Sequence, residues 1–75
     1  MPTEVSGDVE TIEVNGAQRE WTAPLTVGRL LEECRLSAAT VVVELNREIL
    51  RQDGWTGIPL RPGDRVEIVQ LVGGG

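Results

Sequence analysis

The sequence contains no lysine and no histidine, and it has one cysteine, Cys34. Without lysine there is no ε-amine to act as a Schiff-base nucleophile or to accept conjugation. Without histidine, and with one cysteine, neither the usual zinc-binding sets nor a Cys/His or Ser/His catalytic pair can be assembled. One cysteine also excludes an internal disulfide and fits a reducing compartment. The chain therefore has few groups with which to perform chemistry of its own.

Phenylalanine and tyrosine are also absent, and the only aromatic residues are two tryptophans. They offer little surface on which nucleic-acid bases can stack. The net charge of −5 at pH 7 opposes binding to nucleic acid and to anionic membranes, and it favours a basic protein partner. The first residues do not resemble a signal peptide, and no apolar run in the sequence has membrane-spanning length. We therefore expect a cytoplasmic protein with no nucleic-acid or membrane partner.

The length of 75 residues predicts a single domain. Residues 1–8 are polar and without periodicity, so we interpret them as a flexible N-terminal extension. Residues 9–70 carry the periodicities of strands and of one helix and should form the folded domain. Residues 71–75, "LVGGG", follow the last predicted strand as a glycine-rich tail.

Alternating polarity and a turn signal predict a β-hairpin near the start. In "VETIEVNG", Ile12 and Val14 alternate with polar residues, and the segment ends on Asn15-Gly16. Asn-Gly is typical of a type I′ turn, in which both central residues have positive φ. The segment "AQREWT" should be the returning strand.

The periodicity becomes helical in "PLTVGRLLEECRL". Thr26 is a suitable N-cap residue, while Gly28 weakens the first turn by about 1 kcal/mol relative to alanine. The apolar residues fall at i, i+3, i+4 and i+7, which places them on one helical face: Val27, Leu30, Leu31 and Cys34.

The second half of the chain predicts further strands. In "TVVVELN", β-branched residues alternate so that Val41, Val43 and Leu45 should face the core. A turn at Asn46-Arg47 then leads into the short strand "EIL". The following segment, "RQDGWTGIPL", is rich in turn residues and contains Trp55 as an apolar anchor.

The last strand is predicted in "RVEIVQ", after a turn in "RPGD" where Pro62 restricts φ. Val66 and Ile68 should point inward. The order of hairpin, helix and further strands predicts an α+β fold, in which one helix covers one face of a mixed four- to five-stranded sheet. A hairpin followed by a crossover helix is typical of a β-grasp domain.

Several segments together resemble a known family: "EVNG", "TVGRLLEE", "VVVELNREIL", "DGW" and "IPLRPGDRVEIVQLVGGG". They are similar to the ThiS family, ubiquitin-like sulfur carriers of thiamin biosynthesis, over roughly residues 9–75. The resemblance implies that the last strand lies beside the first in parallel and projects the C-terminus from the centre of the sheet. The chain has Asn46-Arg47 where the family usually has Asn-Gly, which predicts another turn type or local strain.

The resemblance also implies a function for the tail. A ubiquitin-activating-type adenylyltransferase would use ATP to adenylate the Gly75 carboxylate. A sulfur donor enzyme would convert the adenylate to a thiocarboxylate, and thiazole synthase would accept the sulfur. The chain would then be a co-substrate with no catalytic residue, metal or bound cofactor of its own.

The glycine tail suits threading into a partner's active site, because a channel that fits bare backbone excludes a Cβ. We expect Gly74 and Gly75 to be the required pair and Gly73 to act mainly as a spacer in the threaded segment. The alternative is a frayed terminus with no role.

The partner is predicted to dock beside the tail. Val69 and Leu71 alternate away from Val66 and Ile68, so they should point off the core and, with Val72 and Glu67, form a docking patch. Simple packing at the edge of the fold and a solvated acidic face are the alternatives. Cys34 is expected to pack in the core, with sulfur handling as the alternative. We expect the free chain to be a monomer.

Other functions share the fold and the tail. One alternative is a sulfur carrier for molybdopterin or cysteine biosynthesis. Proteins of the molybdopterin family tend to have Pro-Pro and aromatic residues shortly before the glycines, whereas this chain has "IVQLVGGG". Another is a non-catalytic ubiquitin-like interaction module, and conjugation to other proteins is a further possibility.

Overall fold

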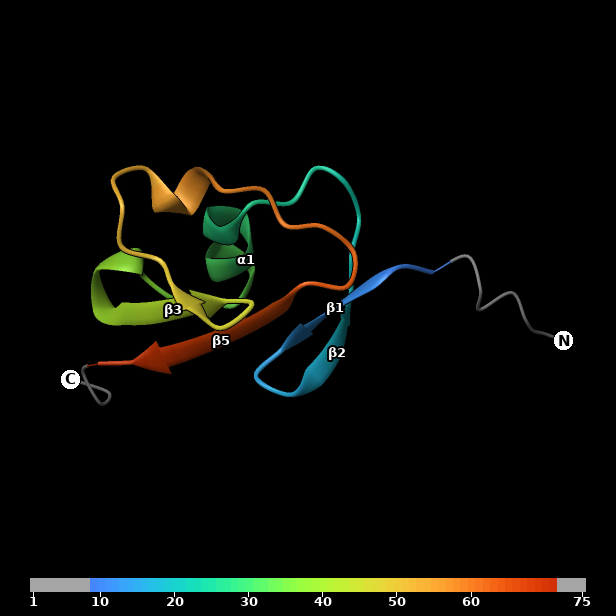
Figure 1. Cartoon of the computed structure of the whole chain (residues 1–75), viewed down its shortest axis with the longest axis horizontal. Coiled ribbons are helices and arrows are strands. Elements are labelled where there is room, and N and C mark those ends of the chain that lie inside the picture. Colours follow the sequence, from blue (N-terminus) through green and yellow to red (C-terminus); the bar gives the residue numbers. More distant parts are fainter. Residues whose placement is uncertain (1–8, 72–75) are drawn as a thin grey trace, which may run out of the picture.

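The computed structural model describes residues 9–71. Within this range a strand hairpin precedes one α-helix, and three strands follow it (Figure 1). The elements are β1 (Thr11–Val14), β2 (Ala17–Glu20), α1 (Val27–Glu33), the 3₁₀ turn η2 (Ala38–Thr40), β3 (Val41–Leu45), β4 (Glu48–Ile49), the 3₁₀ turn η3 (Trp55–Gly57) and β5 (Arg65–Gln70). The predicted order of hairpin, helix and further strands is therefore confirmed, and the two 3₁₀ turns were not predicted.

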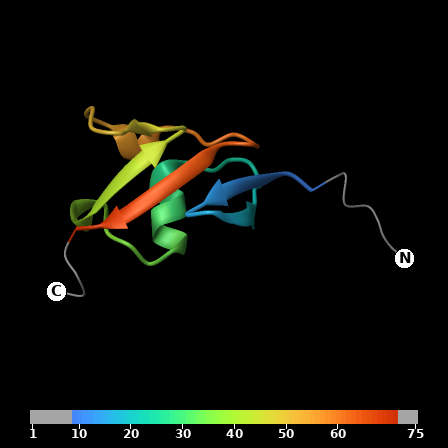
Figure 2. The ribbon, with the colours of Figure 1, turned by 60° about the horizontal axis from the view of Figure 1, so that its bottom comes forward.

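The five strands form one mixed sheet in the order β2-β1-β5-β3-β4. The last strand, β5, lies at its centre, parallel to β1 and antiparallel to β3. Figure 2 shows β5 crossing α1, with β1 on one side and β3 on the other. The α+β fold and the parallel placement of the last strand beside the first are thus as predicted.

Both hairpin turns have left-handed backbone at their two central residues. Asn15 and Gly16 have φ of 50° and 86°, which confirms the predicted type I′ turn. Asn46 and Arg47 have φ of 51° and 74°. The second turn therefore keeps the same kind of backbone without a glycine, and Arg47 adopts a conformation that is unfavourable for a residue with a Cβ.

The helix α1 begins where the sequence predicts. Thr26 Oγ1 accepts a hydrogen bond from the Arg29 N–H at 3.1 Å, which is the N-cap geometry. At Gly28, a Cβ would lie 3.1 Å from the Thr56 carbonyl oxygen and 3.3 Å from the Thr56 Cβ. The glycine that weakens the helix is thus the residue that lets α1 approach η3 closely.

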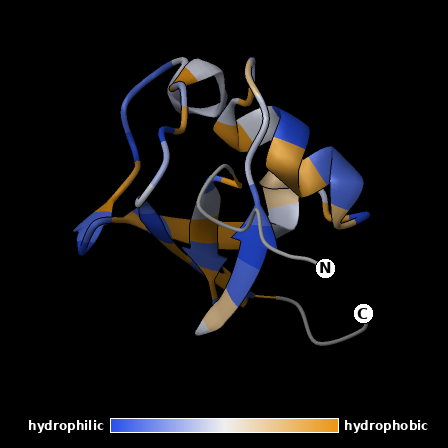
Figure 3. Cartoon of the chain, turned by 90° about the vertical axis from the view of Figure 1, so that its right-hand side faces the viewer, coloured by the Kyte–Doolittle hydropathy of each residue, from blue (hydrophilic) through white to orange (hydrophobic). Residues whose placement is uncertain are grey.

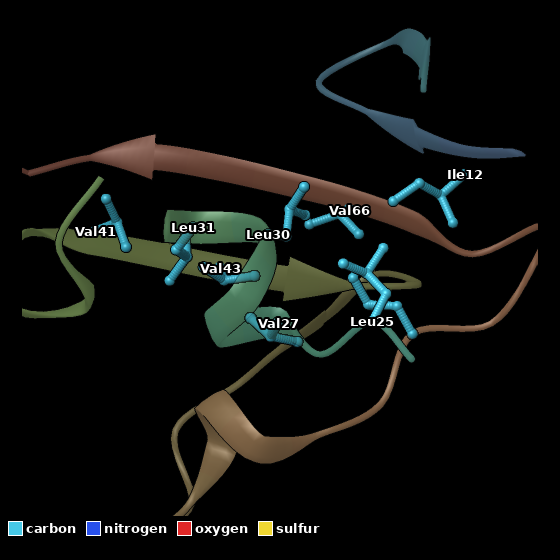
Figure 4. Packing of buried hydrophobic residues seen from close by; sticks show 9 residues of the cluster. Ile12, Leu25, Val27, Leu30, Leu31, Val41, Val43 and Val66 are labelled. Atoms are coloured by element: carbon cyan, nitrogen blue, oxygen red, sulfur yellow. The ribbon is translucent and has the colours of Figure 1, made fainter. Parts of the chain in front are cut away.

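The core lies between the sheet and α1 (Figure 4). Val41, Val43 and Val66 are buried as predicted, and Leu45 and Ile68 pack partly buried against the same cluster. Figure 3 shows hydrophobic and hydrophilic residues mixed within the sheet and along the helix, as expected for elements with one buried side. The buried hydrophobic residues of the described chain are Ile12, Leu25, Val27, Leu30, Leu31, Val41, Val43, Leu60 and Val66.

Leu60 is a core residue that periodicity does not reveal, because it ends a turn-rich segment. It is buried, and its carbonyl oxygen accepts a hydrogen bond from the Trp21 indole Nε1–H at 2.7 Å. Trp55 lies in η3 and packs partly buried against the core, as expected for an anchor. The loop from Leu50 to Leu60 therefore closes the end of the core that the short helix leaves open.

Candidate functional site

Three of the four docking residues predicted from the sequence, Glu67, Val69 and Leu71, lie on the outer face of the sheet, defined here as the face opposite α1. Val66 on the inner face is fully buried, whereas Val69 and Leu71 are 59% and 63% exposed. Glu67 is also exposed. The alternation of β5 therefore points these three residues off the core, as predicted, and next to the segment that continues into the tail.

The strand register adds residues from β3 to this face. Val42 is paired directly with Val69, and Glu44 is paired directly with Glu67. We call these four residues and Leu71 the outer strip. Sequence periodicity places Val42 and Glu44 on the outer face, but it does not show which residues of β5 they meet, because pairing between distant strands is set by the tertiary fold.

The last described residues are fixed in the sheet by backbone hydrogen bonds. Leu71 N–H donates to the Thr40 carbonyl oxygen at 2.8 Å. On the other edge of β5, Asn15 N–H donates to the Val66 carbonyl at 2.9 Å, and the Asn15 side-chain Oδ1 accepts from Ile68 N–H at 2.7 Å. The end of β5 and Leu71, which lead into the tail, are thus held by Asn15 on one side and by Thr40 on the other.

The remaining tail residues, Val72, Gly73, Gly74 and Gly75, lie outside the described residues. Their roles as a docking contact, as the threaded segment and as the site of covalent chemistry therefore stay predictions. Residues 1–8, interpreted as an N-terminal extension, also lie outside the described range.

The opposite end of β5 is held by a side-chain network. Asp64 Oδ1 accepts from the Asn46 Nδ2–H at 3.0 Å, and Asp64 Oδ2 accepts from the Arg61 N–H at 2.8 Å. Asn46 Oδ1 in turn accepts from Arg65 N–H at 2.9 Å. Asp64 therefore has a structural role in joining two turns.

Cys34 lies on the helix side of the sheet. It is the C-cap residue of α1 and packs partly buried against the core cluster. The outer strip is on the other side of the sheet, so the sheet separates the thiol from Val69 and Leu71. This placement favours the packing role over sulfur handling.

A small ionic network joins β2 to α1. Arg19 Nη2 lies 3.2 Å from Glu33 Oε1, and Arg29 Nε lies 3.3 Å from Glu33 Oε2. Hydrogen bonds from Arg19, the larger cause, and from Arg29 hold the pKa of the Glu33 carboxyl below its ordinary value of 4.5. Arg29 and Glu33 also line a surface hollow of about 480 Å³ beside the loop that precedes α1. The two charges pair with each other, so the hollow gains little capacity to bind an ion.

The described part of the chain contains no group of three or more His, Cys, Asp or Glu residues placed to hold a metal ion. In that same part, no helix combines the length and the apolar character needed to cross a membrane. What the geometry provides is a strip of exposed and half-buried residues, mixed apolar and acidic in character, beside a chain segment held by backbone hydrogen bonds.

A mixed sheet packed on one helix, with a parallel central pair and the last strand at its centre, defines a ubiquitin-like β-grasp protein. The model of the ThiS family matches residues 12–75, so the match includes the terminal glycines. The chain belongs to the ThiS family.

Individual relatives agree with this assignment. The chain is 34% identical over 65 residues to the sulfur carrier protein ThiS of Bacillus subtilis, a match that covers 85% of this chain and 98% of that protein. A crystal structure of the thiamine biosynthesis protein ThiS from Geobacter metallireducens superimposes with a TM-score of 0.69 and 32% identity, over 87% of this chain and 99% of that one.

A third match is to part of a larger protein. The chain is 37% identical over 62 residues to a thiazole synthase of Paramagnetospirillum magneticum. This match covers 83% of the chain but 19% of the length of the synthase.

Proposed function

We propose that this protein is a sulfur carrier of thiamin biosynthesis and acts as a co-substrate of other enzymes. The observation that carries the proposal is the family match through residue 75, together with the similarity to a sulfur carrier along almost its whole length. The fold is consistent with this role, since β5 delivers the chain from the centre of the sheet directly into the glycine tail.

The proposed chemistry takes place at the Gly75 carboxylate. A carboxylate is a poor electrophile, and transfer of the adenylyl group of ATP to one of its oxygens, with release of pyrophosphate, makes the carbonyl carbon reactive. A sulfur nucleophile then attacks that carbon and displaces AMP. Sulfide gives the thiocarboxylate directly, whereas the persulfide of a donor enzyme gives an acyl disulfide, from which a reducing thiol releases the thiocarboxylate by cleaving the S–S bond. The adenylyltransferase supplies the ATP site, and the carrier binds no cofactor of its own.

The tail provides reach and bare backbone. Five extended residues, Leu71 to Gly75, span at most about 17 Å. That length allows the reacting carbon to enter an active site while the folded domain stays outside. Gly73 and Gly74 would pass through the narrow entrance of that active site, where a Cβ would not fit. The tail would lose conformational entropy when it becomes ordered in the complex.

The sulfur acceptor is proposed to be thiazole synthase. A protein of that name contains a segment 37% identical to this chain. A carrier-like segment within a synthase suggests that the two work on one pathway. We further propose a cytoplasmic location and a monomeric free carrier, because the carrier must meet several enzymes in turn.

Co-purification tests the pathway. The full chain, expressed in its own organism with an affinity tag at the N-terminus, should retain thiazole synthase after mild washing. A variant lacking Gly74 and Gly75 serves as the control for contacts that require the tail. Recovery of the large subunit of molybdopterin synthase in place of thiazole synthase would overturn the assignment to thiamin biosynthesis.

A further inference from the structure

Two carboxylates occupy directly paired positions at the end of the outer strip farthest from the tail. Glu44 on β3 is paired with Glu67 on β5. Two positions along the same ladder, Asn46 N–H donates to the Arg65 carbonyl at 2.8 Å, so the Glu44–Glu67 pair is of the same hydrogen-bonded type. Like charges at such directly paired positions destabilise an antiparallel sheet.

The described chain does not neutralise this pair. Arg65 lies two residues before Glu67 on the same face of β5, but its Nε is 3.5 Å from the Glu13 carboxylate. Neither Glu44 nor Glu67 takes part in any ion pair within residues 9–71; those pairs are Arg19–Glu33, Arg29–Glu33 and Arg65–Glu13. The free fold therefore places two carboxylates at paired positions without a counter-charge from the described chain, and one cation would supply that counter-charge.

Exposed and half-buried apolar side chains flank the acidic pair. Val42 and Val69 form the next outward-facing cross-strand pair toward the tail, followed by Leu71. On the other flank, Ile49 of β4 is paired with Glu44 and is 45% exposed. Apolar residues gathered around charged ones on an otherwise uncovered sheet face are typical of a protein-binding surface.

The length of the tail limits which proteins can cover this surface. Four residues follow Leu71 in the sequence, and they span at most about 14 Å when extended. An enzyme that takes Gly75 into its active site must therefore lie within that distance of Leu71. The inner face of the sheet is covered by α1, so the outer strip is the uncovered surface next to the tail.

We infer that the outer strip docks the activating enzyme through one cationic side chain seated between Glu44 and Glu67, with apolar side chains packed on Val42 and Val69. This inference rests on the proposed function and names the chemistry of the partner's surface. An arginine suits the position best, because its planar guanidinium can donate to two carboxylates at once. Docking would place a cation between two like charges of the free carrier, so the pair would favour the correct partner over an apolar surface without a cation.

Neutral variants with a matched control test the inference. The full chain and its variants E44Q, E67Q and E32Q are compared as substrates of the purified ubiquitin-activating-type adenylyltransferase of the same organism, by pyrophosphate exchange. Glu32 is exposed on α1, so E32Q removes the same charge from the other layer. We expect KM for the carrier to rise roughly tenfold in E44Q and E67Q with kcat unchanged, and to stay the same in E32Q.

A measurement on the free carrier adds a second readout. E67R places opposite charges across the strands, so its urea midpoint should exceed that of the wild type while its KM rises beyond that of E67Q. Equal KM values for wild type, E44Q and E67Q would overturn the docking inference while leaving the proposed function in place. An equal rise in E32Q would also overturn it. Failure of the wild-type chain to act as a substrate would instead overturn the proposed function.

Discussion

The side chain of Asn15 extends the pairing of β1 along β5: its Oδ1 accepts a hydrogen bond from the Ile68 N–H at 2.7 Å. β1 ends at Val14, and the β1–β5 register runs only to the Val14–Val66 pair. Asn15 therefore satisfies a backbone donor of β5 beyond the end of its partner strand. The same residue has a φ of 50° in the hairpin turn, so one asparagine both forms the turn and holds the part of β5 that leads into the tail.

Replacement of Asn15 should separate these two roles. Asn15→Gly keeps the left-handed backbone accessible but removes the acceptor, so we expect a loss of about 1 kcal/mol in the free energy of unfolding, measured by urea titration. Asn15→Asp retains a side-chain oxygen acceptor and should stay closer to the wild type. If Asn15→Gly were as stable as the wild type, the hydrogen bond to Ile68 would make no net contribution.

Gly28 should resist the usual helix-stabilising substitution. In a helix, alanine in place of glycine typically adds up to about 1 kcal/mol. Here the new Cβ would lie 3.1 Å from the Thr56 carbonyl oxygen, so we expect Gly28→Ala to lower the free energy of unfolding by about 1 kcal/mol through overpacking.

Gly57→Ala is the matched control for this substitution, because a Cβ at Gly57 meets no atom within 4 Å. Thermal or urea unfolding should show little change in that variant. A Gly28→Ala variant more stable than the wild type would contradict this expectation. It would show that α1 and η3 can move apart to make room for the new Cβ at no cost in the free energy of unfolding.

At Arg47, in contrast to Gly28, we expect a favourable substitution: glycine in place of the arginine should raise the free energy of unfolding. Its φ of 74° is unfavourable for a residue with a Cβ, by roughly 1–2 kcal/mol. Arg47→Gly should relieve this and stabilise the fold by up to about 1 kcal/mol, part of the gain being offset by the greater freedom of glycine in the unfolded chain. Arg47→Ala removes the charge but keeps the Cβ, so urea titration should show no such gain; equal stability of the two variants would argue against backbone strain.

The stability contributed by Glu33 should depend on pH. Its pKa is lowered in the folded state by hydrogen bonds from Arg19 and Arg29, so the contribution is present above the ordinary value of 4.5 and is lost as pH falls through the lower folded-state value. Because these pairs are largely solvent-exposed, we expect Glu33→Gln to lower the free energy of unfolding by less than about 1 kcal/mol at neutral pH.

Urea titrations of wild type and Glu33→Gln across this range provide the measurement. The difference between the two proteins should shrink toward zero in acid and should also shrink at high salt. A difference that grows as the pH falls would contradict the sign of the shift.

The sequence predicts those parts of the fold that depend on local pattern. Asn15-Gly16 identifies its turn because positive φ is rare outside a few residue types, and Thr26 identifies the helix start through its cap. The inward alternation of Val41, Val43 and Val66 follows from the two-residue period of strands.

Features that depend on contacts between distant segments are not available from periodicity. Leu60 is buried because a loop folds over the end of the core, and no repeat in its neighbourhood indicates this. The opposition of Glu44 and Glu67 depends on the register of two strands separated by a turn-rich loop. The exposed positions Val69 and Leu71 could be predicted, but the acidic pair beside them became visible only from the paired strands.

The intact mass of the carrier after reaction tests the central claim most directly. The full chain is incubated with the adenylyltransferase, ATP and a sulfur source, beside a variant that lacks Gly75. We expect the wild-type protein to gain the mass difference of one oxygen replaced by sulfur, located at Gly75 by fragmentation, and the shortened variant to remain unchanged. Sulfur incorporation in the chain lacking Gly75, or no incorporation in the wild type under conditions that convert a known ThiS protein, would contradict the proposed role of the tail.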